Sequence, residues 1–397
     1  MHIIYYSPHP THDIVSEVGY ATHQREVINA LRQAGHTVVP VIMGGTELSN
    51  LNPLTSGDYK PSPLKKIIKS VIPRVLWTTF NNVKLRKHDK IAGLKLESAI
   101  QTHKPDLLYE RSEYLQDSGA ICAEKYGLKY FLEVNAPFVE EMRSFEGKSL
   151  LERKAHKIEK FKLDRANKVI AVSSALADFL NKEYQCDNSK LFVQPNCINP
   201  SKIHTESDEI DKLKIKFNLN DKFIFGFVGS IFPYHGVDML INAFSKVHDK
   251  IKGSNLMIVG DGTVIEDLKQ MTIELGIESK VIFTGKIPHS KVFNFMSVMD
   301  VCIMAKSNWY GSPVKVFEYG LMNKPIIAPN TSPIRDVMEN GKDALIVGDN
   351  VKELSDAMLK LFENNKLASD LAAHFNNKVM SSYNWSHAAK NIIELCE

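Results

Sequence analysis

The segment 311–320, GSPVKVFEYG, combines residue types that suit binding of a phosphate and a diol. Ser312 is a capping residue type and Pro313 favours the first helical position, so we expect a helix to begin here. The backbone N–H groups at a helix N-terminus lack partners within the helix and form an anion site. Lys315 lies in the first turn, within reach of that anion, and Glu318 follows about one turn later, where it can accept hydrogen bonds from ribose-type hydroxyls. The spacing therefore indicates a nucleotide site; the alternative is an ordinary amphipathic helix with a solvated Lys and Glu.

Charged and polar residues also follow two apolar runs in the first half of the chain. LLYERSEY places Glu110 and Arg111 at the end of one predicted strand, and FLEVNAPF places Glu133 and Asn135 at the end of the next. Ligands of open α/β sheets gather at the carboxyl ends of strands. We therefore expect a ligand site at these strand ends, in which Arg111 binds a phosphate and Asn135 or Glu133 orients a hydroxyl.

Short apolar runs that alternate with helical stretches predict the elements that position these residues. Strands buried on both faces by crossover helices appear in sequence as continuous apolar runs, so each half of the chain is predicted to form a doubly wound parallel sheet of the Rossmann type. The predicted strands are HIIYYS, TVVPVIM, DLLYE, KYFLEV, KVIAVS and LFVQP in the first half and FIFGFVG, NLMIVG, VIFTG, DVCIMA, PIIAP and ALIVG in the second.

The length of 397 residues exceeds what a single core usually supports, so two domains are expected. The polar stretch 199–212, NPSKIHTESDEIDK, is the predicted boundary. Hydrophobic residues at 44% and charged residues at 24% are ordinary for a folded globular protein. No run is long and apolar enough for a predicted membrane-spanning helix, and HIIYYS resembles a buried strand more than a signal peptide. The five scattered cysteines form neither a disulfide framework nor a zinc pattern, which favours a cytoplasmic location.

Five motifs in order resemble those of the family-4 (group 1) retaining glycosyltransferases, which have the two-domain GT-B fold. The resemblance covers nearly the whole chain, and each motif is weak alone but the set is specific. The motifs are EVGYATHQREVINALRQAGHTVVPV near the N-terminus, KVIAVSSALADFL with LFVQPNCI midway, FGFVGSIFPYHGVDMLINAF, LMIVGDGTVIEDL, and GSPVKVFEYG followed by LMNKPIIAP.

The resemblance implies an α/β fold of two Rossmann-like domains that face a substrate cleft. It implies an acceptor-side domain over 1–200, a nucleotide-sugar domain over 201–375 and a C-terminal helix over 376–397 that packs back on the first domain. Such enzymes transfer a sugar from a nucleotide-diphosphate sugar, UDP- or GDP-linked, to an acceptor hydroxyl that attacks on the face from which the nucleotide departs. No metal or other cofactor is implied, and no Asp-x-Asp dyad is placed at a strand end.

The family's donor-phosphate contacts map onto only some residues of this chain. A glycine loop under the phosphates is represented by Gly19, and a strand-ending glycine by Gly229. The arginine and lysine common in the family are replaced by Ser230 and His235. The resemblance therefore implies that Lys315 is the main cation at the diphosphate, with His235 assisting when protonated.

Two further departures concern the sugar and the acceptor. The family's first glutamate of an acidic pair is Tyr310 here, before Gly311, so donor-sugar recognition does not carry over; a tyrosine can still stack on a sugar or pack in the core. Many relatives place a histidine after the fourth strand, where this chain has Glu133 and Asn135.

Residues 60–104 contain eleven Lys and Arg against two acidic residues. The basic amphipathic pattern over 60–90 indicates contact with an anionic membrane surface, which suits a lipid-linked acceptor of bacterial surface polysaccharide or glycolipid assembly and a peripheral position on the inner membrane face. A solvated helix packed on the first domain is the alternative. No nucleic-acid motif accompanies the charge.

Two rival functions stay open at this point. A GT-B epimerase acting on a nucleotide sugar would need catalytic carboxylates and a histidine in the cleft. A non-catalytic GT-B subunit that only binds nucleotide sugars is suggested by Ser230, His235 and Tyr310 in place of the family's charged residues.

Overall fold

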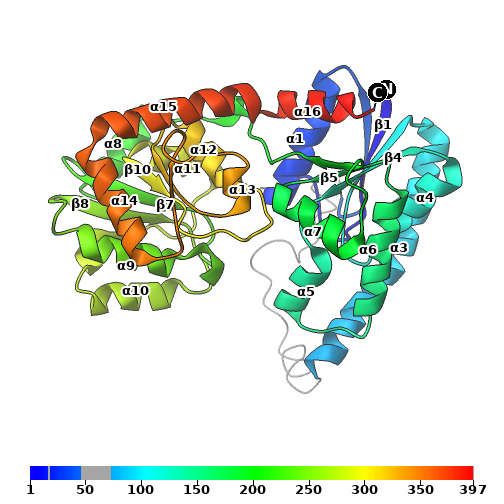
Figure 1. Ribbon diagram of the computed structural model, residues 1–397, viewed down its shortest axis with the longest axis horizontal. Helices are drawn as coiled ribbons and strands as arrows, with labels where there is room; N and C mark the ends of the chain where they lie inside the picture. Colours follow the sequence, from blue (N-terminus) through cyan, green and yellow to red (C-terminus); the bar gives the residue numbers. More distant parts are fainter. Residues whose placement is uncertain (17, 46–72, 397) are drawn as a thin grey trace. The chain divides into compact units, whose positions relative to one another are not determined.

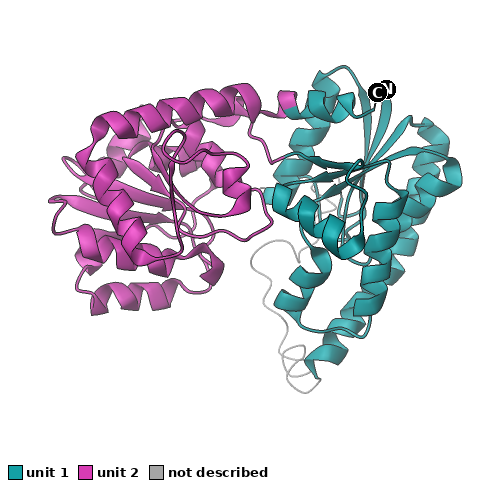
Figure 2. Cartoon of the chain, viewed as in Figure 1, with its two compact units in different colours: residues 1–194, 388–397 teal, residues 195–387 magenta. Residues whose placement is uncertain are grey.

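A computed structural model describes residues 1–16, 18–45 and 73–396. The chain forms two compact units, unit 1 (Met1–Gln194 with Ala388–Glu397) and unit 2 (Pro195–His387) (Figure 1, Figure 2). The division follows Gln194, so the whole of the polar stretch 199–212 belongs to unit 2.

Unit 1 alternates strands with helices along the chain. Its elements are β1 (His2–Ser7), α1 (Gly19–Gln33), β2 (Thr37–Ile42), α3 (Arg74–His103), β3 (Leu107–Arg111), α4 (Ser118–Tyr126), β4 (Lys129–Val134), α5 (Phe138–Glu146), α6 (Glu152–Arg165), β5 (Lys168–Ala171), α7 (Ser174–Tyr184) and β6 (Leu191–Val193).

The unit 1 sheet is six-stranded and parallel, with the order β2-β1-β3-β4-β5-β6. The chain moves from β1 to one neighbour, β2, and then crosses to the other neighbour, β3. A crevice for ligands is expected at the carboxyl ends of the strands where such a sheet reverses its order, here β1 and β3. Residues in register across β3 and β4 include Arg111 and Glu133, which places both at that edge.

Unit 2 repeats the same scheme with longer connections at its end. Its elements are η2 (Pro200–Lys202), α8 (Ser207–Lys216), β7 (Phe223–Val228), η3 (Pro233–His235), α9 (Val237–Val247), β8 (Ser254–Val259), α10 (Ile265–Glu274), η4 (Glu278–Lys280), β9 (Val281–Phe283), α11 (His289–Ser297), β10 (Val301–Ile303), α12 (Val314–Leu321), β11 (Ile326–Pro329), α13 (Ser332–Arg335), β12 (Leu345–Val347), α14 (Val351–Glu363) and α15 (Asn365–Ser382).

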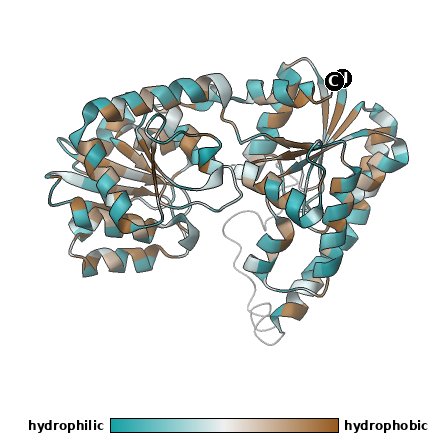
Figure 3. Ribbon diagram, viewed as in Figure 1, coloured by the Kyte–Doolittle hydropathy of each residue, from teal (hydrophilic) through white to brown (hydrophobic). Residues whose placement is uncertain are grey.

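The second sheet has the order β12-β11-β10-β7-β8-β9, again parallel throughout. Its order reverses between β7 and β10, so the carboxyl ends of these strands are the expected ligand edge of unit 2. The two parallel sheets predicted from the apolar runs are confirmed. Figure 3 shows that the strands of both units carry the hydrophobic residues.

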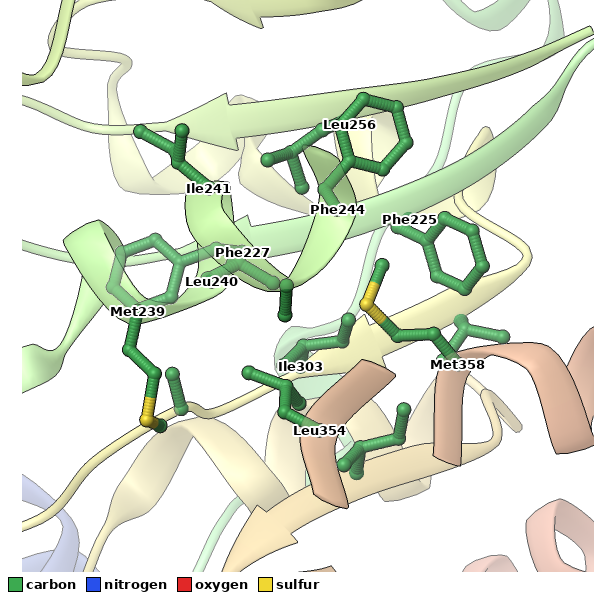
Figure 4. Packing of buried hydrophobic residues seen from close by; sticks show 14 of the residues in the cluster. Phe225, Phe227, Met239, Leu240, Ile241, Phe244, Leu256, Ile303, Leu354 and Met358 are labelled. Atoms are coloured by element: carbon green, nitrogen blue, oxygen red, sulfur yellow. The ribbon is translucent and has the colours of Figure 1, made fainter. Parts of the chain in front are cut away.

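The core of unit 2 lies where helices cover the sheet. Aromatic and aliphatic side chains of β7, β8 and β10 interdigitate with those of α9 and α14 (Figure 4). Ten of them are labelled there: Phe225, Phe227, Met239, Leu240, Ile241, Phe244, Leu256, Ile303, Leu354 and Met358. On the other face, Phe317 of α12 stacks on Phe375 of α15 with ring centroids 6.5 Å apart. The dense packing holds β7 and α12 in fixed positions.

The last helix, α16 (Trp385–Glu394), runs across the point where the chain returns from unit 2 to unit 1. In unit 1, Asn391 donates a hydrogen bond to Gln194 (3.1 Å), and Lys129 donates one to the backbone of Cys396. Residues 376–387, the start of the segment predicted to pack on the first domain, belong to unit 2.

Within the described ranges, none of the helices combines the length and the apolar character needed to cross a membrane. The basic stretch over 60–90 is described only from residue 73, which directly precedes α3; its first part lies outside the described residues.

Candidate functional site

Lys315 occupies the first turn of α12, and its position depends on β7. The hydroxyl of Tyr319, one turn further along α12, accepts a hydrogen bond from the backbone of Val228 at the end of β7 (3.0 Å). Lys315 Nζ in turn lies 4.5 Å from the centre of the Phe227 ring. The helix N-terminus is therefore fixed against the strand end at which the sheet order reverses.

Gly229 leaves room for this ammonium. Its φ of +139° lies in a region that side-chain-bearing residues rarely adopt, and a Cβ there would lie 2.8 Å from Lys315 Nζ. Gly260, after β8, packs equally closely on Gly229: a Cβ at Gly260 would lie 1.9 Å from the Gly229 carbonyl oxygen. The ends of β7 and β8 therefore meet at two glycines. Because no side chain covers them, a ligand can approach the backbone there.

Lys315 Nζ is buried and has no hydrogen-bond partner. Burial lowers the pKa of Lys315 to about 8, and Glu318 opposes that shift only in part. Burying an ammonium away from water without a counter-ion costs free energy. An anion bound beside Lys315 would offset this desolvation cost.

The start of α12 differs from the sequence prediction. The helix begins at Val314 with Pro313 as its N-cap residue and no side-chain cap, so the prediction that Ser312 caps it is wrong. Ser312 instead accepts a hydrogen bond from the backbone of Asn196 through Oγ (3.0 Å), and its carbonyl accepts one from the Asn196 amide (2.8 Å). Without a side-chain cap, the first-turn N–H groups remain available to an anion.

His235 does not supply the second cation. It ends η3, where its Nδ1 lies 2.5 Å from the carbonyl oxygen of Ser230. Burial, together with the charge of Lys315, lowers the pKa of His235 to about 4. At neutral pH the ring is therefore uncharged, which corrects the expectation that a protonated His235 assists Lys315, and Nδ1 is the nitrogen that donates to Ser230.

Glu318 is nearly buried on α12 and forms a 3.0 Å contact with Nε2 of His289, the first residue of α11. The sequence interpretation missed His289, because nothing in the spacing connects α11 with α12. In the loop before α12, Asn308 accepts a hydrogen bond from the Gly311 backbone (2.6 Å), and the rings of Trp309 and Tyr310 meet edge to face at 5.2 Å.

In unit 1 the carboxylate of Glu133 collects four donors. Tyr109 donates at 2.6 Å, Arg111 at 3.0 Å and Asn135 at 2.7 Å, and Nε2 of His23 on α1 lies at 2.7 Å. Burial acts to raise the pKa of Glu133, but His23 and Arg111 outweigh it and hold the pKa well below its usual range. Glu133 therefore positions its neighbours, and its carboxylate has little capacity left to orient an acceptor hydroxyl.

The loop after β1 adds a group of histidines that the sequence interpretation missed. His12 Nδ1 lies 2.8 Å from the carboxylate of Glu113, and its ring stacks between His9 (4.0 Å) and Tyr20 (4.3 Å). The signal available in the sequence was the His-x-x-His spacing directly after the first strand. His12 and Glu113 stand at the ends of β1 and β3, the pair at which the sheet order reverses.

Two other predicted residues have different surroundings. A Cβ at Gly19, the first residue of α1, would meet nothing within 4 Å, so the fold itself does not require a glycine there. Glu110 points to the opposite face of β3 from Arg111 and is fully buried, where Tyr130 donates to it at 2.9 Å. Burial, opposed by Lys162, raises the pKa of Glu110 to about 8, so it belongs to the core and not to the strand-end site.

Comparisons with known proteins identify the family and agree with the fold of two parallel sheets. The family model described as glycosyl transferases group 1 matches residues 209–378, and the model described as glycosyltransferase family 4 matches residues 19–202. HepE of Anabaena in complex with UDP has a similar fold over 100% of this chain and 99% of its own, with a TM-score of 0.73 at 15% identity. Sucrose-phosphate synthase from Thermosynechococcus elongatus has a similar fold over 100% of this chain and 98% of its own, with a TM-score of 0.72 at 15% identity.

Curated relatives match over shorter lengths. An uncharacterized glycosyltransferase of Methanocaldococcus jannaschii is 24% identical over 67% of this chain and 65% of its own. The GDP-mannose-dependent α-(1-6)-phosphatidylinositol monomannoside mannosyltransferase of Mycolicibacterium smegmatis is 22% identical over 51% of this chain and 54% of its own. The chain thus spans between about half and 65% of the length of these relatives. The two family models together cover most of both units, and the chain belongs to the group 1 glycosyltransferases with the GT-B fold.

Proposed function

We propose that this glycosyltransferase is a retaining hexosyltransferase that uses a UDP- or GDP-linked sugar. The observation that carries the proposal is the buried ammonium of Lys315, which lacks a partner and lies at the start of α12 beside Gly229. A diphosphate would pair with this ammonium and with the first-turn N–H groups of α12. HepE, which binds UDP, has the same fold, and the mycobacterial relative is GDP-mannose-dependent.

In this proposal Glu318 accepts hydrogen bonds from the ribose, and Ser230, Tyr310, Gly311 and Ser312 line the donor site. Arg111 and Asn135, oriented by Glu133, act on the acceptor. The acceptor hydroxyl attacks on the face that the nucleotide leaves, and the departing diphosphate takes the proton, so the transfer itself needs no metal. The protein contributes position and charge stabilisation of the leaving group.

A panel of UDP- and GDP-sugars tests this function. We expect one nucleotide class to raise the melting temperature, because a ligand that binds only the folded state stabilises it, and transfer to give a product with the donor's anomeric configuration by NMR. An inverted product would refute retention. Binding without turnover of any donor would favour the non-catalytic subunit, and conversion of the nucleotide sugar into a stereoisomer would favour the epimerase.

We further propose that unit 1 rests on an anionic membrane surface through α3, as suits an acceptor in surface polysaccharide or glycolipid assembly at the inner face of the cytoplasmic membrane. Large apolar side chains recur on one exposed face of α3 at helical spacing: Leu76, Phe80, Val83, Ile91 and Leu94. Exposed lysines accompany them: Lys84, Lys87, Lys90 and Lys95.

Residues near the end of α5 and just after it enlarge the apolar face at the start of α3. Arg74 donates to the Phe145 carbonyl (2.7 Å), and the Leu150 backbone donates to Thr79 (3.0 Å), which brings two more apolar side chains beside α3, exposed by 58% and 69%. Apolar residues among basic ones suit the headgroup region of an anionic bilayer, where each basic residue contributes about 1 kcal/mol.

Sedimentation with vesicles of phosphatidylcholine and phosphatidylglycerol tests the surface. The parent should bind these vesicles in a salt-dependent manner, and the double variant Leu76→Ser, Phe80→Ser should bind less. Ile215→Ser, on α8 and 74% exposed, is the matched control and should bind as the parent does. A parent protein that stays in the supernatant, or a double variant that sediments equally, would refute the membrane proposal.

A further inference from the structure

Three consecutive helices of unit 1 each contribute one metal-ligating side chain to the same place. Glu140 lies on α5, His156 on α6 and Glu183 on α7, the helices labelled in Figure 1. One ligand atom from each, an imidazole nitrogen or a carboxylate oxygen, lies within 4.8 Å of the other two. The residues are far apart in sequence and follow no motif, so only the packing of the three helices unites them.

The ring of His156 is held by a second residue of α7. The Tyr184 hydroxyl lies 3.2 Å from His156 Nδ1, and Tyr184 itself is buried, so the contact restricts the orientation of the imidazole ring. Metal-binding histidines are usually held in this way through their other nitrogen.

The charges at this place call for a cation. Oε2 of Glu140 is buried and has no hydrogen-bond partner. The carboxylates of Glu183 and Glu159 lie near that of Glu140. Glu159 has a cation of its own, Lys162 at 2.9 Å, whereas neither Glu140 nor Glu183 forms a salt bridge with any residue that the structure describes.

We propose that Glu140, His156 and Glu183 bind a divalent transition metal of the zinc type that ties α5 to α6 and α7. One imidazole and two carboxylates are ligands that Zn²⁺ accepts, with water completing the tetrahedron, whereas Mg²⁺ and Ca²⁺ prefer oxygen alone. The metal would fix the start of α5, the helix that follows Asn135 in the chain.

The second His and Glu group of unit 1 is less suited to a metal. There, Thr11 donates from its backbone to Nδ1 of His9, and His12 and Glu113 already pair with each other at 2.8 Å. Arg111 also approaches Glu113 to 3.8 Å, so a cation already faces that carboxylate. These residues serve as the control.

The full-length chain, stripped with EDTA and dialysed, is titrated with ZnCl₂ by calorimetry and with CoCl₂ by visible absorption. We expect one ion per chain and a rise in melting temperature, because the site exists only in the folded chain. Tyr184→Phe keeps the packing but removes the hydroxyl, and should weaken Zn²⁺ binding about 10- to 100-fold.

Glu140→Gln and His156→Ala should each abolish the Co²⁺ spectrum, while His9→Ala should leave it unchanged. Because Glu140→Gln removes a carboxylate that burial disfavours, its apo form should melt no lower than the parent, so loss of the ion cannot be mistaken for unfolding. The proposal is overturned if the parent binds no Zn²⁺, if His156→Ala binds it as tightly as the parent, or if His9→Ala loses it. None of these readouts depends on sugar transfer.

Discussion

Replacing Lys315 with methionine should weaken nucleotide binding and at the same time stabilise the empty protein. Methionine is close to lysine in length and lacks the charge, so the packing against Phe227 is kept. Hydrogen bonds to a charged group contribute about 1.5–3 kcal/mol. At about 1.4 kcal/mol per tenfold, the dissociation constant for UDP or GDP should rise about 10- to 140-fold.

The stabilisation follows from the pKa. Burial lowers the pKa of Lys315 from 10.5 to about 8. At about 1.36 kcal/mol per pKa unit this corresponds to a cost of about 3 kcal/mol for the charged form in the folded state. The cost is fully present below about pH 8, where Lys315 is protonated in both the folded and the unfolded protein. It disappears as the pH rises from about 8 toward the pKa of free lysine. At pH 7, Lys315→Met should therefore unfold at a higher urea concentration than the parent.

Nucleotide affinity should depend on pH in the parent alone. As the pH rises above about 8, the empty protein loses the proton that the bound diphosphate requires, so binding should weaken by up to about tenfold per pH unit. Lys315→Met should show no such dependence.

Calorimetric titrations with UDP and GDP between pH 7 and pH 9, together with urea unfolding at pH 7, test both effects. Lys342→Met replaces an exposed lysine of the same unit and should change neither. Unchanged nucleotide affinity in Lys315→Met, or the same pH dependence as in the parent, would show that the ammonium does not contact the diphosphate.

Three carboxylate replacements extend the reasoning. Glu318→Gln should weaken binding of UDP several-fold but leave pyrophosphate binding unchanged, and equal losses for both ligands in titration would contradict its contact with ribose. Glu133→Gln should be less stable than the parent at pH 7, because the lowered pKa of Glu133 stabilises the fold above about pH 4.3, and urea midpoints should converge as the pH falls below that value; a constant gap would refute this. For Glu110 the sign is opposite: its raised pKa means that the parent loses stability as the pH rises from about 4.3 to about 8, and Glu110→Gln should lack this loss in the same assay. A parallel decline in both proteins would show that Glu110 is not the cause.

Much of the fold could be predicted from the sequence because the signals are local. A strand that is buried on both faces appears in the sequence as a continuous apolar run. Each of the strands β1 to β12 could therefore be predicted from its own residues alone. The prediction of an anion site at 311–320 likewise rests on a local signal, since a helix start and a lysine in its first turn lie within a few residues.

The residues that the prediction assigned wrongly, or missed, depend on partners distant in the chain. Ser312 does not cap α12 because Asn196 binds it, and no local rule connects those two residues. The Glu133 carboxylate is mostly occupied because His23 and Arg111 reach it from other elements. His289 meets Glu318 only when α11 packs beside α12.

Charge states were likewise decided by burial. The sequence determined that Lys315 and His235 are present in the segments after β10 and β7, but not how much water reaches them. The folded unit removes that water, so the pKa of His235 falls to about 4 and the pKa of Lys315 to about 8. Residue types and their order along the chain determined the architecture, whereas desolvation and contacts between distant segments, which exist only after folding, decided which side chains carry charge and which face a ligand.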